Sequence, residues 1–298
     1  MSGCQMSSKF ITFRDLGAFG RLGNQLYQCA AVVALAHKNK IDVKLPNFES
    51  VWHGQKCLMG EFCLSCDHLS ADDIIHHNLQ ESVSSGNYDE KLVDAVVSAS
   101  GNVNLEGYFQ NMKYLSGSEE VVRKNLQPKN EHIENAKSFI NSLNGGKKQV
   151  VGIHVRRGDN TDGTNGSYYD NLYGDDLMDP NTIYGLYIKD ALNIFSSDDY
   201  DFLVFTGGSR NNDNESDIEW VKKVFPQDNF YFSETSDTMT DFSRLMCCDH
   251  NILSHASSFG WWAAFLNQNQ NKKVVAPKLY TTRNEPPKNF FPEEWTIL

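Results

Sequence analysis

Short apolar segments alternate with helical segments through the second half of the chain, and this alternation constrains the fold more than any other feature. Strands are expected at residues 149–155, 201–206, 230–232, 251–254 and 273–276, and helices at 184–195, 216–224, 241–247 and 258–267. The helical segments repeat apolar residues every three to four positions. Strands that alternate with helices predict an open parallel sheet, which binds ligands beyond the carboxyl ends of its strands.

The first half begins with a similar pattern. Residues 11–20 lead into a glycine-containing turn and a helix, whose apolar face is expected at Leu26, Cys29, Ala30, Val33 and Ala34. A strand at 41–45 follows, and further helices are expected at 89–99 and 131–143, whereas little can be placed between 61 and 100. Asn144-Gly145-Gly146 resembles a helix end followed by a hinge. We therefore expect two lobes, residues 1–146 and 147–298.

Composition narrows the class of protein. The 298 residues are 40% hydrophobic and 22% charged, which is typical of globular proteins. The net charge of -11 disfavours broad binding to nucleic acid or anionic membrane. No signal peptide or membrane-spanning segment is visible. A soluble, cytoplasmic protein is the expectation.

Seven cysteines with scattered spacing do not resemble a disulfide framework, which favours a reducing compartment. Cys63 and Cys66 form one C-x-x-C motif beside Cys57, with His53 and His68 nearby. A zinc site is conceivable there, but no second C-x-x-C motif occurs at zinc-finger spacing. Buried thiols are the preferred interpretation.

His154-Val155-Arg156-Arg157-Gly158-Asp159 is the strongest local signal, because it closes the strand at 149–155. Alternation along a strand places His154 and Arg156 on one face and Val155 on the other. A guanidinium at this edge can bind a phosphate through two parallel charged hydrogen bonds. The alternative is a surface arginine pair neutralised by Asp159.

Two further segments could also face an anion. Serines at 257 and 258 open the expected helix at 258–267, and helix amino ends bind anions through free N–H groups; simple capping, with Trp261 and Trp262 in the core, is the alternative. The glycines of Gly20-Arg21-Leu22-Gly23-Asn24-Gln25 could let backbone approach a ligand, or could serve an ordinary turn. This segment fits neither common nucleotide-binding glycine motif.

Taken in order, these segments resemble the α-1,2-fucosyltransferase family, the GDP-fucose-dependent type of glycosyltransferase family 11. The resemblance rests on the following segments: Gly20-Arg21-Leu22-Gly23-Asn24-Gln25-Leu26-Tyr27-Gln28, His154-Val155-Arg156-Arg157-Gly158-Asp159, and Ser257-Ser258-Phe259-Gly260-Trp261-Trp262-Ala263-Ala264. Weaker echoes occur at 107–114, 245–252 and 292–295. His255-Ala256 and Gly260 depart from the usual Asn and Ser of that family.

The resemblance implies an α/β fold of GT-B type, with two Rossmann-like lobes facing across a cleft. The carboxyl-terminal lobe would hold GDP-fucose, and the amino-terminal lobe would shape the acceptor site. By similarity, Arg156 binds the diphosphate, His154 and Asp241 contact guanine, Asn24 faces the reacting sugar, and Asp159 orients the arginine pair. The remaining residues that the resemblance places at the donor are Arg21, Gly23, Arg157, Ser257, Ser258 and Phe259.

The implied reaction is an inverting transfer of L-fucose from GDP-β-L-fucose to the 2-hydroxyl of a galactose-containing glycan. Arg156 and the helix start at Ser257 would stabilise the leaving diphosphate, so no metal or other cofactor is expected. Asp162 and Asp159 are candidates for the general base, and a water relay is a third possibility. Alternatives are a fucosyltransferase of α-1,6 or protein O-linked type, or a non-catalytic GDP-fucose- or carbohydrate-binding protein. The galactoside and the oligomeric state stay open.

Overall fold

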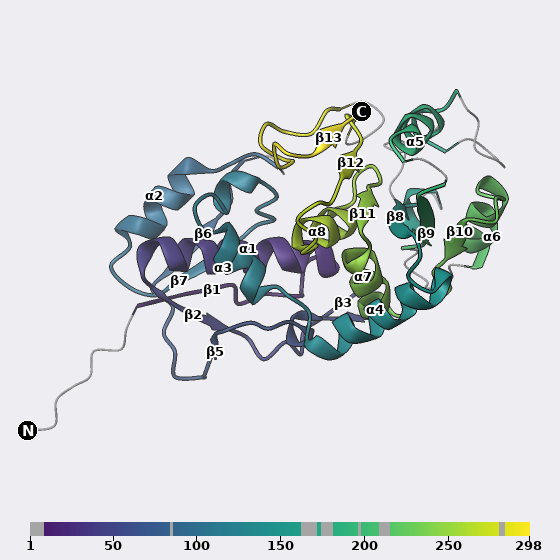
Figure 1. Cartoon of the computed structure of the whole chain (residues 1–298). Coiled ribbons are helices and arrows are strands. Elements are labelled where there is room, and N and C mark those ends of the chain that lie inside the picture. The colour runs from purple at the N-terminus through teal and green to yellow at the C-terminus, as the bar shows by residue number, and fades with distance from the viewer. Residues whose placement is uncertain are drawn as a thin grey trace, which may run out of the picture. The chain divides into compact units, whose positions relative to one another are not determined.

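The computed structural model describes residues 9–83, 86–161, 172–173, 181–195, 198–208, 215–279 and 284–298, apart from the side chain at position 52. The chain divides into two compact units (Figure 1). The N-terminal unit comprises Met1–Pro128 and Pro287–Pro292, and the C-terminal unit comprises Lys129–Pro286 and Glu293–Leu298. A boundary between the lobes was expected after residue 146. In the structure the C-terminal unit begins at Lys129 and so includes helix α4 (Asn130–Asn144).

A five-stranded parallel sheet organises the N-terminal unit. Its strand order is β5 (Asp67–His68), β2 (Asp42–Leu45), β1 (Phe10–Thr12), β7 (Val103–Glu106) and β6 (His77–Gln80). Strands β3 (Val51–Trp52) and β4 (Gln55–Lys56) form a separate antiparallel pair. The helical segments are α1 (Leu22–Asn39), η1 (Met59–Glu61), α2 (Glu90–Ser98), η2 (Met112–Tyr114) and α3 (Glu119–Asn125).

Helix α1 is the central helix of the N-terminal unit. It packs against β1, β2 and α3. The expected apolar face is buried, and so are the other sides of the helix, because every residue from Gln25 to Ala36 is buried, including the polar Gln25 and Gln28. A helix that is covered on all sides belongs to a core rather than to a surface. Lys40 ends the helix in the left-handed conformation, with φ of 54°.

A second parallel sheet organises the C-terminal unit. Its strand order is β10 (Phe230–Phe232), β9 (Tyr200–Thr206), β8 (Gln149–Val155), β11 (His250–Ile252), β12 (Val274–Ala276) and β13 (Thr296–Ile297). Besides α4, its helices are α5 (Ile183–Asn193), α6 (Glu215–Val224), α7 (Thr238–Cys247) and α8 (Ser258–Leu266), and η3 (Gly158–Asn160) is a single 3-10 turn. An α/β fold with parallel sheets is thus confirmed.

Helices cover both faces of strand β8. Val151, Ile153 and Val155 lie in one core with side chains of α5 and α6. The opposite face carries Gly152, whose α-carbon lies against Leu245 of α7 and leaves no room for a side chain. Because side chains alternate along a strand, His154 points toward the α7 and α8 side, where its ring lies 5.4 Å from that of Phe259. The two-sided burial explains why the strand is mostly apolar after the exposed Gln149.

No helix in the described part of the chain is both long and apolar enough to cross a bilayer.

Candidate active site

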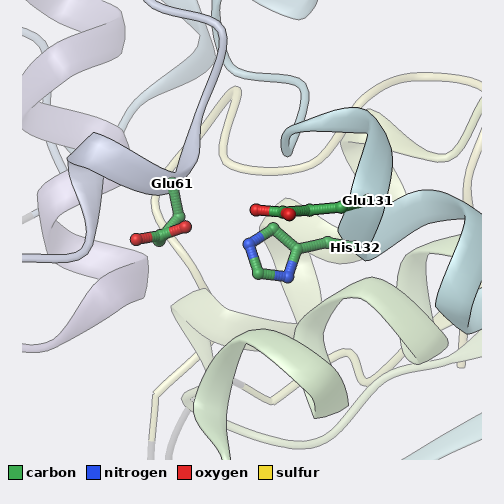
Figure 2. Close-up of side chains that lie close together, drawn as sticks. All are labelled: Glu61, Glu131 and His132. Atoms are coloured by element: carbon green, nitrogen blue, oxygen red, sulfur yellow. The ribbon is translucent and has the colours of Figure 1, made fainter.

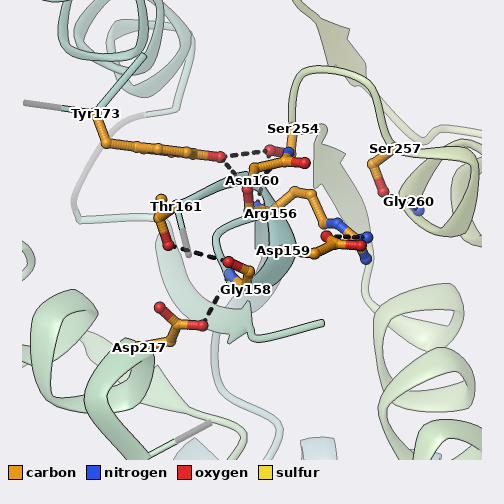
Figure 3. A network of polar contacts seen from close by, with 10 residues as sticks. All are labelled: Arg156, Gly158, Asp159, Asn160, Thr161, Tyr173, Asp217, Ser254, Ser257 and Gly260. Atoms are coloured by element: carbon orange, nitrogen blue, oxygen red, sulfur yellow. Dashed lines mark hydrogen bonds and ion pairs between the residues drawn. The ribbon is translucent and has the colours of Figure 1, made fainter. Parts of the chain in front are cut away.

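The backbone of Arg156, just beyond β8, is fixed by the side chains of Ser254, Tyr173 and Asn160, the last of which donates to the Arg156 carbonyl at 3.2 Å (Figure 3). Its N–H donates to Ser254 Oγ at 2.9 Å, and its carbonyl accepts from the Tyr173 hydroxyl at 2.5 Å. The Tyr173 and Ser254 hydroxyls lie 3.3 Å apart. This network, which sequence reasoning missed, sets the direction in which the Arg156 side chain leaves the sheet. The only sequence signal was the position of Ser254 at the end of the neighbouring strand.

The guanidinium of Arg156 is held by Asp159 and Gly208. Nη2 donates to Asp159 Oδ1 at 2.5 Å, and the two side chains are 18% and 7% exposed. Gly208 follows β9 with φ of 98°, and a β-carbon there would overlap Nη1 of Arg156. The Arg156 side chain therefore sits in a fixed, largely enclosed position at the carboxyl edge of the sheet, where open parallel sheets bind ligands.

Arg157 faces the other side of the turn. Its Nε donates to Asp217 Oδ1 of α6 at 3.0 Å, and its guanidinium lies 4.2 Å from the Trp220 ring centroid. Asp217 Oδ2 also accepts the N–H of Gly158 at 2.9 Å. The expectation that Asp159 orients both arginines was therefore wrong, since Asp159 holds Arg156 and Asp217 holds Arg157. These contacts give Arg157 a role in stabilising the turn. That Arg157 also binds the donor nucleotide sugar stays a prediction.

His154 is a buried, neutral imidazole beside the start of α8. Burial, and then the charge of Arg156, lower its pKa to about 3. Among the described residues its Nδ1 has no hydrogen-bond partner. A β-carbon at Gly260 would lie 2.8 Å from Nδ1, so glycine at this position gives the ring its room. The half-buried Phe259 ring packs between His154 and Phe242.

Ser257 caps α8 at the same edge of the sheet. Its Oγ accepts the Gly260 N–H at 3.4 Å, and Ser258 is the first helical residue. Ala256, just before the cap, adopts φ of 46°, which is unusual for a residue with a β-carbon. The N–H groups of a helix's first turn have no partner within the helix, and such groups can bind an anion.

Asp241 lies in the first turn of α7 with a perturbed carboxyl group. It accepts a hydrogen bond from Ser233 Oγ at 2.6 Å, and Arg244 donates to the same hydroxyl at 3.0 Å. Burial raises its pKa to about 7, against the opposing effects of Ser233 and Arg244. The helix brings Phe242, the next residue, against Phe259, which links Asp241 to the His154 side of the site.

The remaining predicted residues belong to the N-terminal unit or lie outside the described residues. Arg21 precedes α1, Gly23 is buried in its first turn, and Asn24 Oδ1 accepts from Gln110 Nε2 at 2.9 Å. Gly20, with φ of 86°, has Asn24 against its α-carbon. Asp162 lies outside the described residues.

The thiols considered for zinc do not gather in the part of the chain that the structure describes. Cys57 is buried, and Cys63 Sγ lies 3.8 Å from the Pro128 carbonyl. No three ligand atoms from Cys57, Cys63, Cys66, His53 and His68 lie within 4.8 Å of one another among the described residues. Figure 2 draws three further side chains of metal-binding type. Two of them, Glu131 and His132, lie in the first turn of α4 in the C-terminal unit. The third, Glu61 in η1, belongs to the N-terminal unit. Two side chains from one unit are too few for a metal site.

Solved structures that share this fold include two fucosyltransferases. The Bradyrhizobium α-1,6-fucosyltransferase NodZ, co-crystallised with GDP, superposes with a TM-score of 0.55 at 13% identity, covering 88% of this chain and 93% of that protein. POFUT1 in complex with GDP gives a TM-score of 0.55 at 14% identity, covering 90% and 98%. Both likenesses establish the GT-B type of fold for this chain.

Two Escherichia coli proteins are similar in sequence. The alpha-1,2-colitosyltransferase is 26% identical over 214 residues, which cover 67% of this chain and 64% of that protein. The O-antigen biosynthesis glycosyltransferase WbnK is 25% identical over 190 residues, which cover 60% and 56%. The chain thus spans less than two thirds of the length of these curated relatives.

The sequence profile described as glycosyl transferase family 11 matches residues 4–298. That span takes in both parallel-sheet units, the turn that carries Arg156 and Asp159, and the capped start of α8. This chain therefore belongs to glycosyl transferase family 11.

Proposed function

We propose that this glycosyltransferase moves L-fucose from GDP-β-L-fucose to a galactoside 2-hydroxyl with inversion. The observation that carries the proposal is the guanidinium of Arg156, held by Asp159 and Gly208 beyond the carboxyl end of β8. The fold likeness to GDP-bound fucosyltransferases and the α-1,2 linkage in the name of one relative support it.

The leaving group explains why a fixed guanidinium matters. As the sugar–oxygen bond breaks, negative charge grows on the diphosphate, and donors already aimed at that charge lower the barrier. Arg156 offers a planar pair of donors with little left to reorganise, since Asp159 and Gly208 already hold it. The first-turn N–H groups of α8 supply a second set.

The other donor roles are those that the family resemblance implies, and the chemistry of each group is compatible with its role. The neutral imidazole of His154 has one nitrogen that donates a hydrogen bond and one that accepts, so it can pair with either kind of group on guanine. A charged imidazolium could only donate. Asp241 offers carboxylate oxygens to the N–H groups of guanine. Asn24, in the N-terminal unit, is assigned to the reacting sugar.

Of the two aspartates considered as general base, Asp162 is the better candidate. Asp159 Oδ1 already accepts a hydrogen bond from the Arg156 guanidinium, so we assign Asp159 to holding that side chain and not to deprotonating the sugar hydroxyl. A water relay remains the alternative to Asp162.

A second candidate donor is nucleotide-activated colitose. The name of the E. coli relative at 26% identity favours it. The same arginine and helix amino end would stabilise that leaving group if colitose were carried on GDP.

The deciding experiment is a transfer assay with the full chain, a panel of galactosides, and GDP-fucose, GDP-colitose and UDP-galactose as donors, with product linkage read by NMR. Transfer of fucose to a galactoside 2-hydroxyl is the expected result. A 6-linked product, or transfer to protein, would assign a different linkage, and equal use of UDP-galactose would reject a GDP-sugar donor. Binding of GDP-fucose without transfer or hydrolysis would identify a non-catalytic binding protein.

Arg156→Ala and Arg156→Lys test the role of the guanidinium. Losing one preorganised donor typically lowers kcat about 10²–10³-fold, and lysine, which lacks the planar fork, should restore little. Lys137→Ala, at an exposed cation of the same unit, is the matched control. If Arg156→Ala melts like wild type and keeps more than about a tenth of the turnover, the diphosphate is bound elsewhere.

A further inference from the structure

Two aromatic side chains are exposed beyond the carboxyl ends of neighbouring strands in the N-terminal unit. Phe19, after β1, is 53% exposed, and Tyr108, after β7, is 44% exposed. The buried amide of Gln28 joins the two loops, because its Nε2 donates to the Phe19 carbonyl at 3.3 Å and to the Gly107 carbonyl at 3.4 Å. One buried side chain therefore ties together the backbones of the two loops that carry these aromatic residues.

The turn that presents Tyr108 has a strained backbone. Gly107 adopts φ of 148°, and Phe109 adopts φ of 54°, a conformation rare for a bulky side chain. Glu81 Oε2 accepts the N–H groups of Tyr108 at 2.9 Å and Phe109 at 3.0 Å. The Glu81 carboxylate therefore holds the turn in this conformation.

The strained turn separates two aromatic neighbours. Phe109 is 1% exposed and packs edge-on against Phe13 and Tyr114, whereas Tyr108 is turned outward. Backbone strain that persists in a fold is concentrated at sites of function. Here the strained turn keeps the Tyr108 ring exposed, in a loop that Gln28 ties to the loop of Phe19.

Uncharged hydrogen-bonding groups occupy the same edge of the sheet. Gln110, two residues beyond Tyr108, donates to Asn24 in the first turn of α1. Aromatic faces can cover the apolar C–H surface of a sugar ring, while amides bind its hydroxyl groups. A neutral carbohydrate fits this edge better than an anionic ligand does, because the Glu81 carboxylate already lies at the turn that presents Tyr108.

We propose that Phe19 and Tyr108 form a platform on which a neutral sugar ring of the acceptor glycan stacks. The assignment rests on the proposed glycosyl transfer, which requires an acceptor site, and deepens it by naming the side chains. The carboxyl edge of an open parallel sheet is also where such folds bind their ligands.

The test compares Phe19→Ala, Tyr108→Ala and Tyr108→Phe with Ile74→Ala. Ile74 is a matched control, because it is 67% exposed in the same unit but precedes β6 and so lies at the amino edge of the sheet. Each alanine variant at the platform should raise the acceptor KM up to about tenfold, while the affinity for GDP and the melting temperature stay at wild-type values. Tyr108→Phe keeps the ring and should keep the KM.

Acceptor KM values for Phe19→Ala and Tyr108→Ala that match that of Ile74→Ala would overturn the platform. A second measurement separates this proposal from the proposed function. Binding of lactose to the full chain, followed by saturation-transfer NMR, needs no turnover and should weaken in both alanine variants. If wild type transfers no fucose but this pattern holds, the proposed function fails and the platform stands; if fucose is transferred and lactose binding is unchanged in the variants, the platform fails alone.

Discussion

The guanidinium of Arg156 lies directly over the α-carbon of Gly208. A β-carbon there would overlap Nη1 and would also come within 2.9 Å of Cζ. The carbonyl of Gly208 lies 3.4 Å from the N–H of Asp159, the residue that holds the same guanidinium. Gly208 thus contributes to the position of the Arg156–Asp159 ion pair in two ways. Its lack of a side chain leaves room for the guanidinium, and its carbonyl accepts the Asp159 N–H.

Gly208→Ala should lower transfer activity more than it lowers stability. Alanine adds strain at φ of 98° and displaces Arg156, and a displacement of about 1 Å at a reacting group can cost about 10²-fold in rate. Gly145→Ala is the matched control, because its φ of 66° brings strain but no atom lies within 4 Å of its added β-carbon. We expect both variants to melt below wild type and only Gly208→Ala to lose kcat. Equal activity of the two would mean that Arg156 does not depend on Gly208.

Arg157→Ala should act on stability. It leaves the Asp217 carboxylate, which is 6% exposed, without its charged partner and removes a cation–π contact at 4.2 Å from the Trp220 centroid. Breaking a buried ion pair by removing one partner typically costs about 3–5 kcal/mol. Denaturant unfolding should show a loss of stability in both Arg157→Ala and Asp217→Ala, larger in Asp217→Ala because the Gly158 N–H also loses its acceptor, and the double variant should lose less than their sum. Wild-type stability in Arg157→Ala would contradict this assignment.

The sequence predicted the strand that ends just before Arg156 because that segment is mostly apolar. It predicted a ligand-binding edge there because strands and helices alternate along this half of the chain. It missed the partners, since Arg157 meets Asp217 60 residues later and Asn24 meets Gln110 86 residues later. Neither pairing leaves a local pattern. The start of α7 was placed three residues late, at 241 instead of Thr238, because the cap by Asp237, whose side chain accepts the Thr240 N–H, was not recognised.

Transfer should persist in excess EDTA. The proposed stabilisation of the diphosphate uses only Arg156 and the amino end of α8, so a chelator should change kcat by less than about twofold. The assay compares turnover before and after chelation and again after adding Mg²⁺ or Mn²⁺. Abolition by EDTA with recovery on adding either ion would show that a cation carries part of the leaving-group charge.

Asp241 should make GDP binding depend on pH near neutrality. Its pKa of about 7 leaves most carboxyl groups protonated at pH 6, whereas the N–H groups of guanine require the ionised acceptor. Affinity should therefore rise about tenfold from pH 6 to a plateau above pH 7, and binding below pH 7 should release a proton. Calorimetry in buffers of different ionisation enthalpy measures that proton directly.

The Asp241 carboxyl group should make the stability of the free protein fall as pH rises, whereas it makes the affinity for GDP rise. Since the folded-state pKa lies above the ordinary value of 3.8, the protonated form stabilises the fold, and this contribution is present below pH 3.8 and lost as pH rises toward 7. Asp241→Asn should therefore melt higher than wild type at pH 8 and yet bind GDP more weakly there. Asp190→Asn, at an exposed carboxylate of α5, should change neither property. A ratio of GDP affinities between wild type and Asp241→Asn that stays constant from pH 6 to 8 would remove Asp241 from the guanine site.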